Sequence, residues 1–223
     1  FGWKKLYTFV IMVLDKKVAE QTINFLTQIN AIKLNTKNPF TWTSGIKSPI
    51  YCDNRLLLSY PKIREFIADS MSQIIKNKYG SNISIAGVAT GAIAIGIMIA
   101  EKLNLPYAYI RPEPKGHGLK NQIEGYINKN SSVVVIEDLI STGKSSLNAI
   151  NALKSDGYNV MGMLSIFSYN FEFANKKFKS EKITINSLAD YNTLVEIIES
   201  KGDLSDEEIS RLKKWREDPK SWA

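Results

Sequence analysis

Residues 133–146 read VVVIEDLISTGKSS and constrain the fold of this chain more than any other segment. The first four are β-branched, which is typical of a central parallel strand that is covered on both faces. In open α/β folds, ligands bind beyond the carboxyl ends of the strands. We therefore expect the strand to end where Glu137 and Asp138 begin, and these acids to lie at a ligand-binding edge.

The chemistry of this segment indicates a phosphorylated sugar. Two adjacent carboxylates can accept hydrogen bonds from vicinal sugar hydroxyls, and residues 141–145 offer hydroxyls and backbone N–H groups at the start of a helix. A helix N-terminus with free amides binds anions such as phosphate. The segment therefore predicts a site for a phosphorylated ribose.

Two other interpretations of the segment stay open. Gly143, Lys144 and Ser145 spell the end of a nucleotide P-loop, but that pattern needs a glycine five positions before Gly143. Position 138 is Asp, which would repel a triphosphate. A solvated turn is the other alternative, because acidic turns often follow hydrophobic strands.

The acid pair and the following T-G-x-S turn resemble the phosphoribosyl diphosphate (PRPP) signature of the type I phosphoribosyltransferases. The resemblance implies that the acids bind the ribose 2- and 3-hydroxyls and that the turn binds the 5-phosphate. It also implies a catalytic role for Asp138. The PRPP-binding residues implied in this segment are Glu137, Asp138, Leu139, Ile140, Ser141, Thr142, Gly143, Lys144 and Ser145.

Residues 40–58, FTWTSGIKSPIYCDNRLLL, resemble the base-binding segment of orotate phosphoribosyltransferases. Lys47 and the amides around Gly45 can face a carboxylate, and Tyr51 offers a ring for stacking. The resemblance implies that Lys47, Tyr51 and Ser141 bind orotate. The alternative is an ordinary hairpin with a Ser-Gly turn and a surface lysine.

Residues 111–125, RPEPKGHGLKNQIEG, have no apolar period and predict a loop. Loops longer than about 12 residues in a compact domain are usually lids, binding loops or disordered. The segment is similar to the family's flexible catalytic loop. The similarity implies that Arg111, Lys115 and His117 bind the pyrophosphate of PRPP, with Lys115 and His117 catalytic and in part serving the neighbouring subunit. Pro112 stands where many family members have a lysine, so one phosphate donor is missing or replaced.

Residues 83–100, ISIAGVATGAIAIGIMIA, are apolar enough to raise the question of a membrane span. Their glycines and the Thr-Gly break favour a buried strand, turn and helix instead. In the resemblance, the turn of residues 89–91 lies against the pyrophosphate. Gly91 replaces a lysine of some relatives, which predicts that backbone amides act there.

Composition agrees with one compact enzyme domain. The 223 residues are 44% hydrophobic and carry a net charge of +7. No basic cluster with interleaved aromatics is present, so we expect neither nucleic acid nor a membrane as a partner, and a positive field suits polyanionic PRPP. The single cysteine, Cys52, fits a reducing cytoplasm and is expected to be buried.

The resemblance implies an α/β fold of the type I phosphoribosyltransferases, with a central, mainly parallel sheet flanked by helices, a small N-terminal hood and a flexible catalytic loop. We expect residues 1–11 to be a non-native or upstream extension and residues 12–223 to form a single domain. Helices are expected at residues 16–34 and 61–79, and a capping box at Ser205 and Glu208. Further strands are expected near Ile83, Tyr107, Val133, Val160 and Ile183, and further helices near Ala92, Ser145, Phe171, Ser187 and Ser205.

The function implied is transfer of 5-phosphoribosyl from PRPP to orotate, with Mg²⁺ bridging PRPP oxygens, in a cytoplasmic homodimer that shares its active sites across the interface. Two alternatives stay open. A purine phosphoribosyltransferase would share residues 133–146 but should lack the base segment of residues 40–53. A PRPP-sensing regulator usually adds a DNA-binding module, and no helix-turn-helix candidate precedes Phe40.

Overall fold

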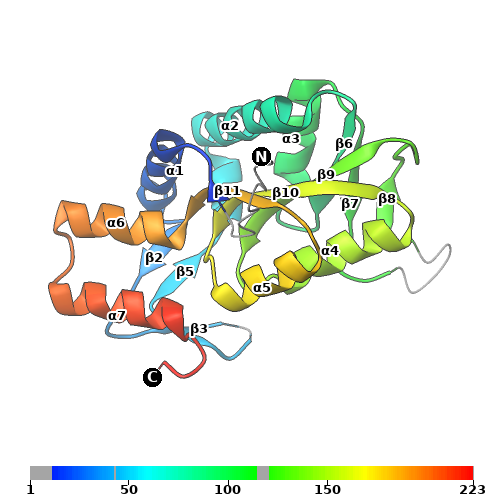
Figure 1. Cartoon of the computed structure of the whole chain (residues 1–223). Coiled ribbons are helices and arrows are strands. Elements are labelled where there is room, and N and C mark those ends of the chain that lie inside the picture. The colour runs from blue at the N-terminus through cyan, green and yellow to red at the C-terminus, as the bar shows by residue number, and fades with distance from the viewer. Residues whose placement is uncertain (1–11, 43, 115–120, 223) are drawn as a thin grey trace, which may run out of the picture.

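The computed structural model describes residues 12–42, 44–114 and 121–222, and a central sheet dominates this part of the chain (Figure 1). Seven described strands form the sheet in the order β1-β11-β10-β9-β6-β7-β8, and β8 alone among them runs antiparallel to its neighbour. Their bounds are β1 (Met12–Val13), β6 (Ile83–Val88), β7 (Tyr107–Ile110), β8 (Ile123–Gly125), β9 (Ser132–Ile140), β10 (Asn159–Ser168) and β11 (Ile185–Asp190). The expected central, mainly parallel sheet is confirmed.

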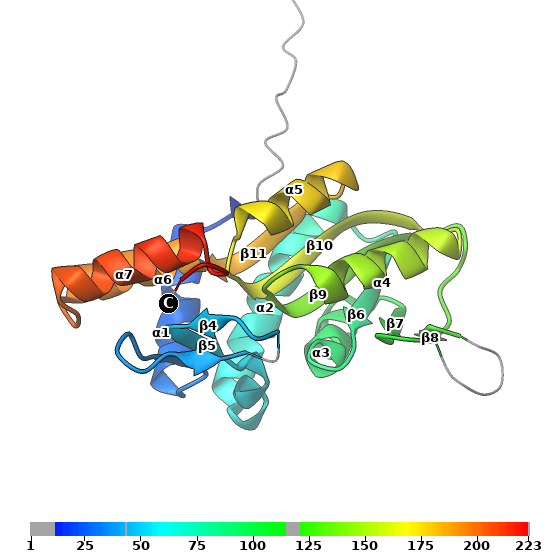
Figure 2. The same ribbon diagram turned by 90° about the horizontal axis from the view of Figure 1, so that it is seen from below.

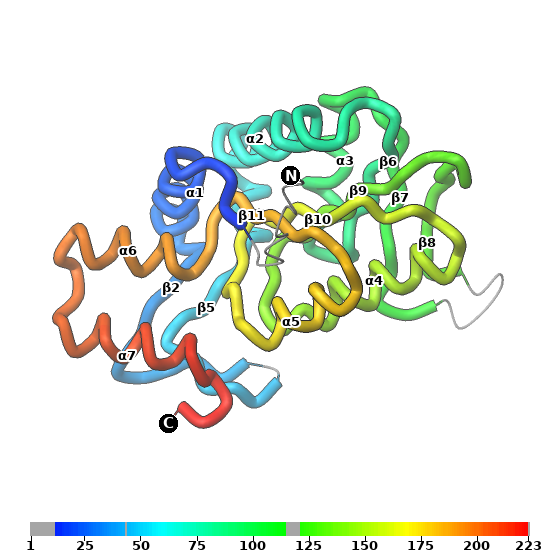
Figure 3. Tube along the Cα trace, in the orientation of Figure 1, coloured from blue at the N-terminus to red at the C-terminus, as the bar shows by residue number. Residues whose placement is uncertain are grey.

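Helices cover both faces of this sheet. From β6 the chain moves to β7 on one side of the sheet, and from β9 it moves to β10 and then β11 on the other side. Because such crossovers are right-handed, α3 (Ile93–Leu103) lies on the face opposite α4 (Lys144–Ser155) and α5 (Glu172–Ser180). Two further helices, α1 (Lys16–Gln28) and α2 (Pro61–Tyr79), lie on the side of α3 (Figure 3). The residues of β9 from Val133 to Ile136 are fully buried between these layers.

A smaller unit stands beside one edge of the main sheet. There β2 (Ile32–Leu34) pairs with β5 (Ile50–Cys52), and β3 (Phe40–Thr41) pairs with β4 (Lys47–Ser48), both antiparallel. The 3₁₀ helix η1 (Asn54–Ser59) then leads into α2, and the C-terminal helices α6 (Tyr191–Lys201) and α7 (Asp206–Glu217) complete this end of the molecule (Figure 2). This unit corresponds to the expected hood.

Four sequence-based boundaries are wrong. The helix expected at residues 16–34 ends at Gln28, because Asn30 takes a left-handed conformation (φ 56°) and residues 32–34 form β2. The helix expected near Ser187 is strand β11, and α6 begins only at Tyr191. Strand β9 continues through Glu137 and Asp138 to Ile140. The expected loop after Arg111 contains β8 at its end.

Other sequence-based expectations are confirmed. Helix α2 spans Pro61–Tyr79, and the Ser205–Glu208 capping box opens α7. Cys52 is buried. Residues 83–103 form a buried strand, a turn and helix α3, and no helix in the described ranges is long and apolar enough to cross a membrane. Residues 1–11, the expected extension, lie outside the described residues.

Candidate active site

Glu137 and Asp138 lie near the carboxyl end of β9, in the middle of the sheet. Glu137 is only 3% exposed, and its Oε2 accepts hydrogen bonds from Ser146 Oγ at 3.0 Å and from Ser145 Oγ at 3.4 Å. Burial raises the pKa of Glu137 well above its usual range, and the charge of Asp138 adds to the rise. Burial also raises the pKa of Asp138. Burial therefore disfavours the charged form of the acid pair, which hydroxyl donors or cations would stabilise.

Two other segments of the chain meet at Asp138. Asn54 donates a hydrogen bond from Nδ2 to the Asp138 carbonyl oxygen at 2.6 Å, from the start of η1. Gly91, in the turn before α3, packs directly on the carboxylate, and a Cβ atom there would lie 2.2 Å from Asp138 Oδ2. Gly91 thus leaves room for the carboxylate, and a side chain at this position would displace it.

The turn of residues 141–143 connects the acid pair to α4. Gly143 is the N-cap of α4 at φ 75°, a left-handed conformation that favours glycine, and a Cβ there would lie 2.9 Å from Phe178. No side-chain hydrogen bond caps this helix. Its first N–H groups are therefore suited to an anion at the end of the sheet where the acids lie.

The remaining predicted residues of this segment differ in exposure. Lys144 and Ser145 lie in the first turn of α4, and Lys144 is exposed. Ile140 is buried, and its carbonyl oxygen accepts a hydrogen bond from the Tyr169 N–H at 2.9 Å. Leu139 packs against the hydrophobic core. The two aliphatic residues therefore shape the strand end, whereas the neighbouring polar residues offer hydrogen-bonding groups.

The predicted base segment forms a hairpin and an exposed aromatic surface. Lys47 is exposed on β4, and its Nζ donates to Thr41 Oγ1 across the hairpin at 2.9 Å. Tyr51 on β5 is 39% exposed, and its ring lies 5.8 Å from that of Phe40. Tyr51 lies three positions before Asn54, which bonds to the Asp138 carbonyl, so a short stretch of chain links the aromatic surface to the acid pair.

Hydrogen bonds join the two ends of the predicted lid at its base. The Arg111 N–H donates to the Gln122 carbonyl at 2.8 Å, and Gln122 Nε2 donates to the Arg111 carbonyl at 3.0 Å. The Arg111 guanidinium lies 3.9 Å from the Glu124 carboxylate. The predicted catalytic residues Lys115 and His117 lie outside the described residues.

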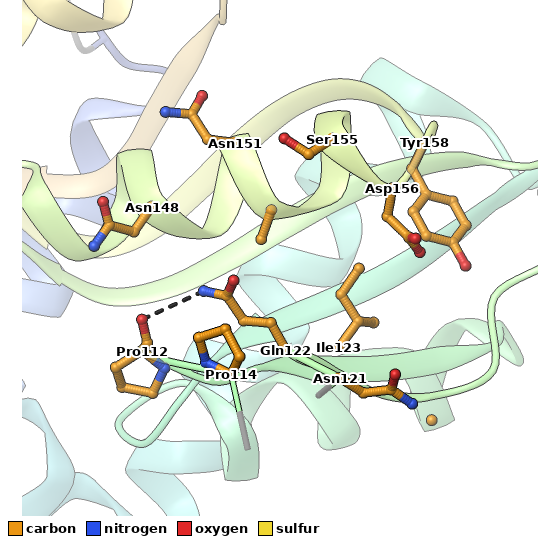
Figure 4. Close-up of a pocket in the computed structure, with 12 residues that line it drawn as sticks. Pro112, Pro114, Asn121, Gln122, Ile123, Asn148, Asn151, Ser155, Asp156 and Tyr158 are labelled. Carbon is orange, nitrogen blue, oxygen red and sulfur yellow. Dashed lines mark hydrogen bonds between the residues drawn. The ribbon is translucent and has the colours of Figure 1, made fainter. Parts of the chain in front are cut away.

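A cavity beside the lid base does not coincide with the acid pair. It has a volume of about 730 Å³ and lies between the lid base and α4, where Gln122 bonds to the Pro112 carbonyl (Figure 4). Asn148, Asn151 and Ser155 on α4 line its other side. It flanks the base of the predicted lid, whereas the acid pair lies beside the N-terminus of α4, where Ser145 and Ser146 bond to Glu137.

Sequence reasoning missed two residues at this site. Asn54 had no assigned role, although it is buried and bonds to Asp138. Arg55 forms a bidentate ion pair with Asp53, with contacts of 2.7 Å and 2.8 Å. Burial raises the pKa of Asp138, and the positive charge of Arg55 opposes that rise. The signal was the polar run D-N-R directly after a strand.

Comparisons with known proteins agree with this arrangement. Residues 56–186 match the family described as "Phosphoribosyl transferase domain". The orotate phosphoribosyltransferase of Phocaeicola vulgatus is 48% identical over 209 residues, which cover 94% of this chain and 97% of that protein. The protein of the same name from Porphyromonas gingivalis is 46% identical over 198 residues, covering 89% of this chain and 94% of that protein.

Solved structures show the same likeness. The orotate phosphoribosyltransferase from Aeropyrum pernix is 30% identical and superposes with a TM-score of 0.71, covering 82% of this chain and 99% of that chain. The UMP synthase of Leishmania donovani superposes with a TM-score of 0.73 at 25% identity and covers 90% of this chain, which corresponds to 42% of that larger chain. The fold is therefore that of the type I phosphoribosyltransferases, and the chain belongs to the orotate phosphoribosyltransferase family.

Proposed function

We propose that this protein transfers the 5-phosphoribosyl group from PRPP to orotate, giving orotidine 5′-phosphate and pyrophosphate in pyrimidine synthesis. The observation that carries the proposal is the hydrogen bond from Asn54 to Asp138, because it joins the base segment to the acid pair. The relatives that cover nearly the whole chain carry the name of this enzyme.

In this proposal, different residues of the site bind different parts of PRPP. As the bond from C1 to pyrophosphate breaks, the ribose gains positive charge, and the protein must stabilise the leaving group and align the attacking nitrogen. Glu137 and Asp138 hold the ribose hydroxyls, and residues 141–145 hold the 5-phosphate at the N-terminus of α4. Arg111, Lys115 and His117 bind the pyrophosphate, and the lid excludes water.

Lys47, Tyr51 and Ser141 complete the proposed site on the side of the base. The Lys47 ammonium pairs with the carboxylate of orotate, and Tyr51 stacks on its ring. Exposure of both side chains in the hood supports this assignment.

Magnesium belongs to the proposal as an ion held mainly by PRPP. Among the described residues, no group of three His, Cys, Asp or Glu side chains could hold a metal ion. Mg²⁺ usually keeps several waters and binds one or two carboxylates together with substrate phosphates, so the half-buried Asp138 fits it better than the buried Glu137. When bound, it would neutralise charge on the pyrophosphate.

We further propose a cytoplasmic homodimer with shared active sites. A single buried cysteine fits a reducing compartment. Leu56, Tyr60 and Ile97 are 40–46% exposed on η1, at the N-terminus of α2 and on α3, and a two-fold interface would cover such apolar surface.

Subunit mixing tests the shared site. Lys115→Ala and Asp138→Ala proteins should each be nearly inactive, and random exchange between them should restore about a quarter of the sites, by the symmetry of a two-fold dimer. Persistent inactivity after exchange has been verified would show that the lid acts within its own subunit.

A panel of free bases tests the reaction itself. With PRPP and magnesium, pyrophosphate release is measured for orotate, uracil, adenine and hypoxanthine. Orotate should react by far the fastest, because a site built around a carboxylate leaves its donors unpaired when the base lacks one. Comparable rates for uracil, or a preference for a purine, would reassign the protein within the family. Binding of PRPP without turnover of any base would favour a PRPP-sensing regulator.

A further inference from the structure

Helix α7 lies against the β3–β4 hairpin that carries Lys47 (Figures 1 and 2). The contact is made by Trp215, a fully buried residue in the last turn of the helix. Its indole Nε1 donates a hydrogen bond to the Lys47 carbonyl oxygen at 2.8 Å, across 168 positions of sequence. The C-terminal helix thus holds the backbone of the residue that is proposed to bind the carboxylate of orotate.

The indole of Trp215 is fixed in place by other aromatic rings. Its ring centroid lies 5.7 Å from Trp42, 5.8 Å from Tyr169 and 5.3 Å from Tyr191. Trp42 in turn follows β3 and donates from its own indole to the Ile50 carbonyl at 3.3 Å. These rings pack around the indole in the orientation that directs its N–H toward the Lys47 carbonyl.

Polar contacts anchor both ends of α7. At its start, Glu208 accepts a hydrogen bond from Thr36 Oγ1 at 2.9 Å, and Thr36 lies in the connection between β2 and β3. At its end, Arg216 donates to the Asn170 carbonyl at 2.9 Å, just beyond β10. The helix therefore joins the hood to the main sheet.

The hairpin itself supplies little rigidity. Strands β3 and β4 have two residues each, and isolated hairpins of this kind are marginally stable at best. The position of Lys47 must then depend on tertiary contacts, among which the bond from Trp215 acts directly on its backbone.

We propose that Trp215 is a positioning residue for the base: by holding the Lys47 carbonyl, it sets where the Lys47 ammonium meets the carboxylate of orotate. This inference rests on the proposed function and extends it, because it assigns part of the base specificity to the C-terminal helix.

The test compares Trp215→Phe with Tyr191→Phe. The first keeps an aromatic ring and removes the N–H that binds Lys47. The second removes a hydroxyl from the same aromatic cluster, which donates to the Leu212 carbonyl of α7 at 3.1 Å and not to the hairpin. Initial rates are measured with each substrate varied in turn, and thermal unfolding is measured for each protein.

Trp215→Phe should raise the KM for orotate about two- to tenfold, the range expected for loss of one neutral hydrogen bond, and leave the KM for PRPP within twofold. Both variants should lower the melting temperature to a similar degree, because each loses one hydrogen bond of the aromatic cluster. Tyr191→Phe should leave both KM values unchanged. An unchanged KM for orotate in Trp215→Phe, an equal rise for both substrates, or an equal effect in Tyr191→Phe would overturn the inference.

A second variant covers the case in which Trp215→Phe does not fold. Trp215→Tyr keeps a larger ring than Phe and likewise removes the indole N–H that binds the Lys47 carbonyl, so it should also raise the KM for orotate selectively. An unchanged KM for orotate there would overturn the inference. An inactive wild-type protein would instead refute the proposed function, and the inference with it.

Discussion

Replacement of Asp138 by Asn should weaken PRPP binding and leave the fold intact. Asn keeps the size of the side chain, so it fits the space against Gly91, and it keeps the backbone carbonyl that Asn54 holds. Burial already raises the pKa of Asp138, so removal of its charge costs the folded protein little. What is lost is the carboxylate that accepts hydrogen bonds from the ribose.

The magnitude follows from the strength of a charged hydrogen bond. Such a bond contributes about 1.5 to 3 kcal/mol, which corresponds to roughly a 10- to 150-fold increase in the Kd for PRPP. Isothermal titration calorimetry with PRPP and magnesium measures the change, and thermal unfolding measures stability. Asp156→Asn is the matched control, because it removes the same charge from an exposed ion pair with Lys129.

The control should bind PRPP as the wild type does. If Asp138→Asn also bound PRPP with wild-type affinity, the acid pair would not be the ribose site. If its affinity fell only in proportion to a loss of thermal stability, the charge would have a structural role and the reasoning would fail.

Three further predictions concern Gly91, Glu137 and Lys47. Gly91→Ala should weaken PRPP binding in calorimetry without lowering the melting temperature much, because the methyl group displaces the Asp138 carboxylate; unchanged affinity would contradict this. Glu137→Gln should match the wild type in stability at acid pH and exceed it near neutral pH. Because its pKa is raised on folding, Glu137 stabilises the protein below its unfolded pKa of about 4.3, and that contribution is lost as pH rises through the folded pKa. Melting curves across pH test this, and a wild type that gains stability over the variant with rising pH would refute it. Lys47→Met should raise the KM for orotate at least tenfold, about the loss expected for a charged hydrogen bond, and leave the KM for PRPP unchanged; steady-state rates would contradict the assignment if both rose together.

The sequence predicted the sheet well because its strands are strongly patterned. The β-branched run at residues 133–136 predicted a central strand, and these residues of β9 are buried on both faces. The end of α1 was mispredicted because Ile29 and Ile32 fit the apolar period of a helix, whereas the left-handed Asn30 between them ends it. The helix predicted near Ser187 was wrong because strand β11 runs directly into α6. Asp190, the N-cap of α6, is the signal that marks the boundary between them.

The candidate site was predicted where local sequence carries the chemistry and missed where distant contacts do. The acids and the Gly143 turn are contiguous in sequence and were found together. The bonds from Asn54 to Asp138 and from Trp215 to Lys47 span 84 and 168 positions, and no local pattern specifies them. The roles of all the predicted site residues stay predictions, and Lys115 and His117 also lie outside the described residues.

The most direct test of the proposed reaction is the absorbance of orotate on addition of PRPP and magnesium to the purified protein. We expect the absorbance to fall, pyrophosphate to appear in equal amount, and neither change to occur when PRPP is left out. A folded protein that binds PRPP yet leaves the absorbance of orotate unchanged would contradict the proposed function.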